Sequence, residues 1–529
     1  MTWDVQADVV VVGFGAAGAC AAIEATDAGA DVVVLDRFGG GGATALSGGV
    51  VYAGGGTDEQ RAAGVGDSPE AMYDYLSTEV GDAVAPATLR AFCRDSAAQL
   101  TWLRRRGVPF EGSLCPHKTS YPTNRHYLYH SGSELSARAL APPAPRGHRV
   151  RGRGTSGALL FARLASAVRA RGAPVLTQTS ARRLLTDDTG RVVGVECATL
   201  RGAPRWAALA HRVLHRCATK PWLYVPKLGR LLHRPVAALE RRYARPLRVG
   251  ARQGVVLAAG GFVANRAMMR RHAPAYRGGL PLGTPADDGS GILLGTGVGA
   301  ATAHLDRVSV WRFLSPPSAL LRGMLVDRAG RRVCDESRYG AAIGEAVVTR
   351  HQGWAWLLVD RRVLAEARRE LRGQTLWFQR LQAWYLLSVA RRSAPTVAAA
   401  ALRAGIDPEG LVATVKEYNT AARAGAPDAA GKPVELVAPL EQPPYSLIDC
   451  SVRPRLAYPA PMLTLGGLRV VEETGQARRA DGSAIPGLYA AGRTAVGVCS
   501  QSYVSGLSLA DCVFSGRRAG RHAAGATSR

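Results

Sequence analysis

Several features that mark particular protein classes are scarce or missing in this sequence. Only five of its 67 basic residues are lysines. Its nine cysteines are scattered and form no Cys-x-x-Cys pair, which argues against a disulfide framework or a metal site and favours a reducing cytoplasm. We expect no transmembrane span, because no run of about 18 uncharged apolar residues occurs. We also expect no signal peptide, since residues 1–8 contain acid but no basic residue.

Acidic residues are outnumbered in the chain. The 529 residues include 67 Lys and Arg against 41 Asp and Glu, a formal net charge of +26. One explanation is a GC-rich genome that favours arginine codons. The other is an anionic partner, either membrane headgroups or nucleic acid. The 47% of hydrophobic residues and the 61 glycines exclude a disordered chain and allow a sizeable core.

A dinucleotide-binding motif opens the chain. A valine-rich strand is predicted over residues 7–12, followed by Gly-x-Gly-x-x-Gly, an alanine-rich helix and a second strand over 31–36. The first glycine allows a tight turn, the second lets backbone approach a pyrophosphate, and the third lets helix and strand pack closely. The acid that ends the second strand is expected to bind a ribose hydroxyl. The motif assigns these cofactor contacts: Gly13, Gly15, Ala16, Ala17, Gly18, Asp36 and Arg37.

A second glycine-rich stretch over residues 39–49 follows the ribose acid directly. Small residues there permit another close approach to an extended dinucleotide, which favours FAD over NAD. The stretch contains no histidine, so we expect the FAD to be bound non-covalently. The contacts predicted in this stretch are Thr44, Ala45, Ser47, Gly48 and Gly49.

These segments resemble the fumarate reductase/succinate dehydrogenase flavoprotein superfamily, and within it the 3-ketosteroid dehydrogenases. Further segments at 254–262, 284–291, 327–337 and 486–493 agree with this resemblance. A helix predicted to begin near residue 508 would direct its positive N-terminus at the flavin. The resemblance implies further FAD contacts at Ala259, Gly260, Asp288, Ala491, Gly492, Gly506, Ser508 and Leu509.

The resemblance also implies the organisation of the chain. We expect an α/β fold with a discontinuous Rossmann-like FAD-binding domain over residues 1–283 and 441–529. An α+β cap domain is expected between them at 284–440. Two segments stand out as insertions: a basic one near 201–250, and one at 374–392 whose Trp377, Leu381, Trp384 and Tyr385 fall on one helical face.

Both insertions allow more than one interpretation. A basic amphipathic stretch with aromatic residues suits a membrane interface. Alternatively, each segment is a surface helix docked on its own domain. Nucleic-acid binding is disfavoured, because no recognition motif accompanies the charge. We therefore expect a cytoplasmic protein, with peripheral contact to the inner face of the cell membrane as the first alternative.

Tyrosines mark the expected active site. Dicarboxylate reductases of the superfamily hold a substrate carboxylate with an arginine where this chain has Tyr503. A phenol can donate to a ketone but cannot pair bidentately with a carboxylate, so an uncharged steroid or other apolar ketone is expected as substrate. Nearby Arg493 and Arg517 keep a dicarboxylate in consideration. Tyr503 and Ser505 resemble the Tyr-x-Ser element of the 3-oxo-5α-steroid 4-dehydrogenases, and Tyr339 falls at a cap-domain tyrosine.

Desaturation next to a ketone requires a group that polarises the carbonyl, a base for the α-proton and a hydride acceptor. Tyr503 and Tyr339 are predicted to supply the first two roles. Ser505 would relay a proton or lower the pKa of Tyr503 by hydrogen bonding, and the Gly506 amide would add an oxyanion contact. Flavin N5 accepts the hydride. Tyr121, Tyr127 and Tyr129 are predicted to line the substrate cleft.

Three functions remain open from the sequence. The first is an FAD-dependent 3-oxosteroid dehydrogenase, acting at C4–C5 in preference to C1–C2. The second is a fumarate- or enoate-type reductase. The third is a flavoprotein that docks on a membrane electron-transfer partner through its basic segments. The sequence does not identify the electron acceptor.

Overall fold

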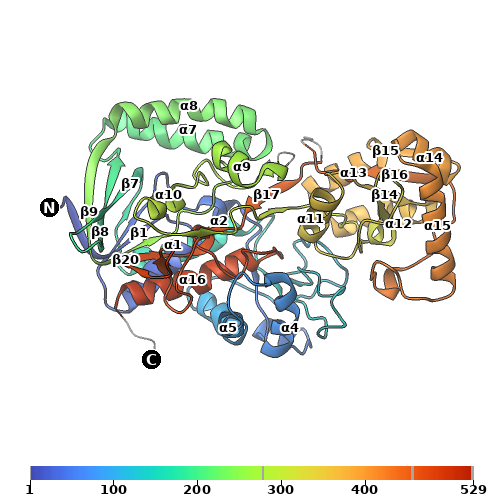
Figure 1. Cartoon of the computed structure of the whole chain (residues 1–529), viewed down its shortest axis with the longest axis horizontal. Helices are drawn as coiled ribbons and strands as arrows, with labels where there is room; N and C mark the ends of the chain where they lie inside the picture. The colour runs from blue at the N-terminus through green and yellow to red at the C-terminus, as the bar shows by residue number, and fades with distance from the viewer. Residues whose placement is uncertain (1, 277–278, 454–457, 526–529) are drawn as a thin grey trace.

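A mainly parallel sheet of valine-rich strands forms the centre of the larger of two lobes (Figure 1). The computed structural model describes residues 2–276, 279–453 and 458–525. Strand β1 (Val5–Val12) pairs in parallel with β2 (Val32–Leu35) and with β9 (Arg245–Leu257), and β20 (Ala484–Ala490) continues the sheet beside β9. The paired segments Val9–Val12, Val32–Leu35 and Val255–Leu257 are apolar and buried because helices and loops cover both sheet faces.

Two helices far apart in sequence pack against each other beneath this sheet. Helix α1 (Ala16–Asp27) follows β1, and α16 (Leu507–Ala523) lies directly against it. A Cβ at Gly516 would come within 2.5 Å of the Ala17 carbonyl oxygen. Glycine at position 516 therefore permits close backbone contact between α1 and α16. This contact brings the glycine-rich segments that precede the two helices to one site.

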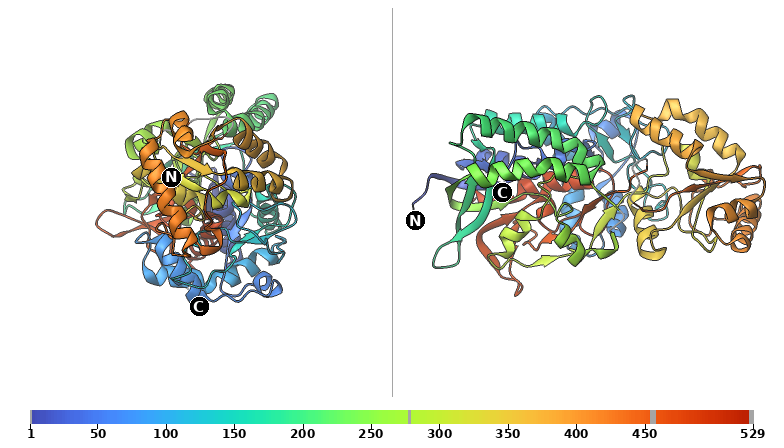
Figure 2. Two further views of the ribbon diagram at one scale, coloured as in Figure 1. Left: turned by 90° about the vertical axis from the view of Figure 1, so that its right-hand side faces the viewer. Right: turned by 90° about the horizontal axis from the view of Figure 1, so that it is seen from above.

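The basic insertion forms a helical hairpin on the larger lobe. It follows the antiparallel pair β7 (Thr179–Thr186) and β8 (Val192–Thr199) and comprises α7 (Arg205–Tyr224) and α8 (Pro226–Tyr243). The hairpin runs along the upper side of the lobe in Figure 1, and Figure 2 shows it from above. Its turn reaches toward the smaller lobe, where the end of α7 contacts β10 (Leu280–Pro281).

The smaller lobe has its own antiparallel sheet and its own hydrophobic core. The strand order is β13 (Met324–Val326), β14 (Trp356–Val359), β16 (Tyr445–Asp449) and β15 (Arg391–Ala394). The helices of this lobe are α11 (Gly340–Arg350), α12 (Arg361–Gln374), α13 (Trp377–Ser388), α14 (Val397–Ala404) and α15 (Pro408–Arg423).

A small three-stranded sheet joins the two lobes. Strand β17 (Pro461–Thr464) lies between β10 and β12 (Val308–Val310). The fold prediction is confirmed: a parallel-sheet nucleotide-binding lobe carries an inserted α+β lobe. The domain borders remain predictions; the cap sheet itself continues through β16, past residue 440, and α10 (Ser290–Thr296) packs into the core of the larger lobe. No helix in the described ranges is long and apolar enough to cross a membrane.

Candidate active site

The turn after β1 requires glycine because of its backbone conformation and because of the close contacts that its residues make. Gly13 has a φ of +103°, and a Cβ there would lie 2.5 Å from the Ala258 carbonyl oxygen. A Cβ at Gly18 would lie 1.9 Å from the Gly13 carbonyl oxygen. The first and third motif glycines thus serve packing. They let α1 start close to the sheet with its N-terminus facing the adjacent cavity.

Asp36 organises this turn with its carboxylate. It accepts backbone hydrogen bonds from Phe14 (3.0 Å), Phe38 (2.8 Å) and Gly40 (3.0 Å). The side chain also lines the cavity. A carboxylate has about four acceptor positions, so one remains for a ribose hydroxyl.

Arg37 is held between two acids. Its guanidinium lies 2.8 Å from Glu240 of α8 and 3.0 Å from Asp288. His211 of α7 also contacts Glu240, at 3.2 Å. Burial alone would raise the pKa of Glu240, but the hydrogen bonds from His211 and Arg37 outweigh it and lower the pKa to about 2. The inserted hairpin is therefore tied by charge to the nucleotide site.

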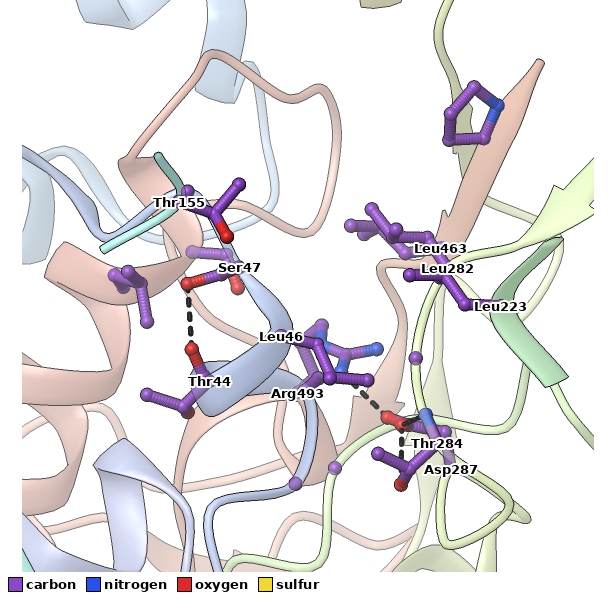
Figure 3. A pocket seen from close by; sticks show the side chains of 18 of the residues that line it. Thr44, Leu46, Ser47, Thr155, Leu223, Leu282, Thr284, Asp287, Leu463 and Arg493 are labelled. Carbon is purple, nitrogen blue, oxygen red and sulfur yellow. Dashed lines mark hydrogen bonds and ion pairs between the residues drawn. The ribbon is translucent and has the colours of Figure 1, made fainter. Parts of the chain in front are cut away.

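The second glycine-rich stretch folds into the short helix α2 (Gly42–Leu46), which faces the start of α1. Thr44 Oγ1 accepts a hydrogen bond from the Ala16 amide at 3.0 Å, and Ser47 Oγ donates to the Thr44 carbonyl at 2.8 Å (Figure 3). The two predicted FAD-binding segments thus form one wall.

A single cavity of about 910 Å³ runs along this wall and between the lobes. Gly18 and Ala45 do not line it. All the other predicted cofactor contacts do: Gly13, Gly15, Ala16, Ala17, Asp36, Arg37, Thr44, Ser47, Gly48, Gly49, Ala259, Gly260, Asp288, Ala491, Gly492, Gly506, Ser508 and Leu509.

Arg493 and Asp287 form a buried ion pair at the cavity wall that sequence reasoning did not assign. Arg493 Nη2 lies 2.6 Å from Asp287 Oδ1. Asp287 also accepts from the Thr284 amide at 2.8 Å (Figure 3). Arg493 Nη1 is buried without a hydrogen-bond partner among the described residues. A buried, unsatisfied donor on a cavity wall fits an acceptor atom of a bound cofactor.

Helix α16 brings its N-terminus to the same cavity. Gly506 precedes it with a φ of +93°, and a Cβ there would lie 2.7 Å from the Tyr52 amide nitrogen. Ser508 and Leu509, in the first helical turn, line the cavity. This arrangement places the positive end of the helix dipole where negative charge on a reduced flavin would be stabilised.

Three predicted catalytic residues come together at the lobe interface. Tyr339, Tyr503 and Ser505 all line the cavity. The rings of Tyr339 and Tyr503 have centroids 6.3 Å apart, and Trp311 stacks on Tyr503 at 5.3 Å. Tyr339 comes from the residue before α11, whereas Tyr503 and Ser505 come from the loop before α16.

Hydrogen bonds give the tyrosines different environments. Burial raises the pKa of Tyr503, and a hydrogen bond from the Gly506 amide opposes that rise. Burial and the neighbouring Tyr503 and Tyr129 raise the pKa of Tyr339, against which a hydrogen bond with Ser505 acts. The Ser505 hydroxyl also lies 3.2 Å from the Tyr129 hydroxyl. Ser505 thus connects two phenols.

The three tyrosines predicted to line the substrate cleft have separate positions. Tyr121 lines the cavity, but its hydroxyl donates to the carbonyls of Gly48 (2.7 Å) and Gly154 (3.1 Å). Tyr127 and Tyr129 are buried and are not among the lining residues. Tyr121 therefore supports the FAD-binding loop, and Tyr129 reaches the site through Ser505.

The part of the cavity formed by the lobe interface is apolar and aromatic. Most of these side chains were not predicted from the sequence, because no local motif marks them. They include Leu282, Trp311, Phe313, Leu314, Leu320, Leu357, Phe378, Leu386, Ile448 and Leu463. Such a lining suits a rigid apolar substrate with one polar end at the tyrosines.

Comparison with known proteins identifies the class. Residues 8–506 match the FAD binding domain family. The chain therefore belongs to this family, and it is an FAD-dependent oxidoreductase, as the sequence predicted.

Its relatives include steroid dehydrogenases and, at 24% identity, fumarate reductases. The chain is 38% identical to the 3-oxo-5-alpha-steroid 4-dehydrogenase of Comamonas testosteroni over 93% of each protein. It is 28% identical to the 3-oxosteroid 1-dehydrogenase of Mycobacterium tuberculosis over 94% of each. The crystal structure of 3-ketosteroid-delta4-(5alpha)-dehydrogenase from Rhodococcus jostii RHA1 with 4-androstene-3,17-dione superposes with a TM-score of 0.83 and 34% identity. That alignment covers 99% of this chain and 98% of the other. The predicted resemblance is confirmed.

Proposed function

We propose that this enzyme introduces the C4–C5 double bond into 5α-3-oxosteroids. The Tyr-x-Ser pair of Tyr503 and Ser505, beside Tyr339 on the wall of the cavity, carries this proposal. The glycine-rich wall, Asp36 and the start of α16 would hold FAD, which would supply the hydride acceptor. The protein supplies orientation, carbonyl polarisation and proton transfer.

Tyr503 is the carbonyl-polarising group in this proposal. Its hydroxyl accepts from the Gly506 amide, so its own proton is available to a ketone oxygen. Each donor in such a chain polarises the next. Burial raises its pKa, which keeps the phenol protonated and able to donate throughout the neutral range.

Tyr339 is the proton acceptor: it acts as its phenolate and becomes a neutral phenol when it takes the α-proton. A tyrosine with an ordinary pKa of about 10 is a weak base at neutral pH. Burial makes the Tyr339 phenolate still less favourable, and the Ser505 hydrogen bond offsets part of that cost. The 3.2 Å contact between the Ser505 and Tyr129 hydroxyls fixes the position of the Ser505 side chain.

The dicarboxylate alternative loses support from the arginine positions. Arg493 is neutralised by Asp287 at 2.6 Å, and Arg517 contacts Glu24 of α1 at 2.7 Å. A bidentate carboxylate clamp needs a guanidinium available at the reacting centre. Tyr503 occupies that position instead.

Anaerobic mixing of the yellow holoenzyme with 5α-androstane-3,17-dione tests the proposal. Bleaching of the flavin absorbance with formation of the 4-ene product is the expected result. Formation of a 1-ene product would assign the enzyme to the Δ1 alternative. Failure to bleach, together with reoxidation of chemically reduced enzyme by fumarate, would overturn the steroid proposal in favour of a reductase.

We further propose that the enzyme acts at the cytoplasmic face of the membrane and passes its electrons to an acceptor there. The inserted basic hairpin and the aromatic α13 support this location, because neither is needed to build the nucleotide-binding sheet.

A further inference from the structure

Exposed apolar side chains concentrate on the two inserted segments. Of the 18 large hydrophobic residues that are exposed in the described part of the chain, eight lie between Trp206 and Leu232 and five between Trp377 and Val389. Three residues of the face predicted for α13 point outward: Trp377, Leu381 and Trp384 are 73%, 63% and 57% exposed. The fourth, Tyr385, is partly buried and packs against the core of the smaller lobe. The smaller side of α13, with Ala383, Leu386 and Leu387, packs on its own lobe. Scattered exposed apolar residues are ordinary, whereas concentrated patches mark interaction sites.

Two groups define this surface. The turn cluster, at the hairpin turn and the start of α8, comprises Tyr224, Val225, Leu228, Leu231 and Leu232. The α13 cluster comprises Trp377, Phe378, Leu381, Trp384 and Val389. In Figure 1 the hairpin and α13 both lie on the upper side of the molecule.

Both clusters reach the lining of the active-site cavity. Leu223 and Tyr224 line it from the hairpin, and Trp377 and Phe378 line it from α13. Figure 3 shows Leu223 beside Leu282 on the wall of this cavity. A partner that covers both clusters would therefore lie beside this cavity.

The charge around the clusters has one sign. The hairpin from Arg205 to Tyr243 carries nine Lys and Arg and one acid, Glu240, which is already paired with Arg37. The sequence from 371 to 392 contains four arginines and no acid. Interleaved cations and exposed aromatic side chains complement anionic headgroups above an acyl layer.

We propose that the turn cluster and the α13 cluster dock the enzyme on an anionic phospholipid bilayer, with the cavity opening toward the lipid. Aromatic rings enter the interfacial region while the arginines contact headgroups. The cavity then receives its apolar ketone directly from the membrane. The substrate part of this inference depends on the proposed function; the docking itself does not.

Vesicle co-sedimentation of the full-length holoenzyme tests the docking without turnover. We expect pelleting with vesicles of phosphatidylcholine and phosphatidylglycerol at low salt, weakened at high salt as headgroup attraction is screened. Absence of binding to these vesicles at low salt, or equal binding to pure phosphatidylcholine, would overturn the proposal.

Matched substitutions locate the surface. The pairs Leu228→Gln with Leu231→Gln, and Leu381→Gln with Trp384→Gln, replace exposed residues that do not line the cavity. Each pair is expected to weaken vesicle binding about tenfold. Leu402→Gln, at a residue 69% exposed on α14 of the same lobe as α13, is the control and should bind like the wild type. Equal binding by all variants would refute the assignment.

Two further readouts separate this inference from its alternatives. Brominated lipids should quench part of the tryptophan fluorescence, and Trp384→Gln should reduce that quenching.

If the clusters instead pair two copies of the chain, light scattering will show a dimer that the same variants dissociate without vesicles, which would overturn lipid docking. With a water-soluble steroid, both paired variants should retain wild-type kcat, so a failure of docking and a failure of the proposed chemistry are distinguishable.

Discussion

Replacement of Tyr503 by phenylalanine tests the assignment of the carbonyl-polarising group. The ring would remain stacked on Trp311 at a centroid distance of 5.3 Å, so packing is preserved. One hydrogen bond with the Gly506 amide is lost, which changes the free energy of unfolding by about 1 kcal/mol. The donor to the developing enolate oxygen is lost as well. Removal of one such donor costs about 2.7–4 kcal/mol of transition-state stabilisation, or about 10²–10³-fold in kcat.

The assay is single-turnover flavin bleaching at saturating steroid under anaerobic conditions. A larger isotope effect with C4-deuterated substrate is expected in Tyr503→Phe, because slower enolisation makes proton abstraction more rate-limiting. Tyr127→Phe is the control, since Tyr127 is buried outside the cavity and its hydroxyl contacts only the Gly152 carbonyl, at 3.4 Å, among the described residues. Bleaching by Tyr503→Phe within about twofold of the wild type would refute the reasoning.

Three other predictions concern the base, the hairpin and the helix crossing. Wild-type kcat should still be rising with pH at about pH 10, because burial raises the pKa of Tyr339 above its ordinary value and the phenolate fraction grows with pH below that pKa. Tyr339→Phe should lower kcat at least 10²-fold and flatten that profile. Glu240→Gln should weaken FAD affinity about tenfold, because it removes the ion pair between Arg37 and the hairpin; fluorescence titration measures this affinity. Glu196→Gln, which removes an ion pair on strand β8, is the control and should have no effect. Gly516→Ala should lower the free energy of unfolding in urea by about 2 kcal/mol, because the new methyl meets a backbone oxygen at 2.5 Å; Gly373→Ala, where no atom lies within 4 Å, should not. Equal stability of these two alanine variants would contradict the crossing argument.

The C-terminal border of the inserted lobe depends on strand pairing that the sequence does not reveal. The resemblance located an inserted lobe, but strand β16 joins its sheet from beyond the expected end at residue 440. Strand membership depends on pairing with β14 and β15, which are distant in the chain. A sheet edge is a tertiary property, and the alternation of a five-residue strand does not reveal its neighbour.

For α13, the sequence predicted which residues share a helical face, but not what that face contacts. Its helical spacing was readable from the sequence, but the same spacing suits a face packed on its own domain or a face left open. The structure places the bulky side of α13 outward and the smaller side inward. Periodicity specifies which residues share a face, and packing decides what that face contacts.

The sequence by itself determined the strand–turn–helix that binds a dinucleotide, because the strand, the spaced glycines, the helix and the acid that ends the next strand all lie within residues 7–36. It also pointed to Tyr339, Tyr503 and Ser505 through short motifs. Only the tertiary structure decided the pairings across the fold, as in Arg37 with Glu240, Asp287 with Arg493, and Tyr129 with Ser505. These partners lie 203, 206 and 376 residues apart in the chain. Local patterns carry no information about which distant charge or hydroxyl will satisfy a buried group, since that choice is made when the sheet and the two lobes assemble.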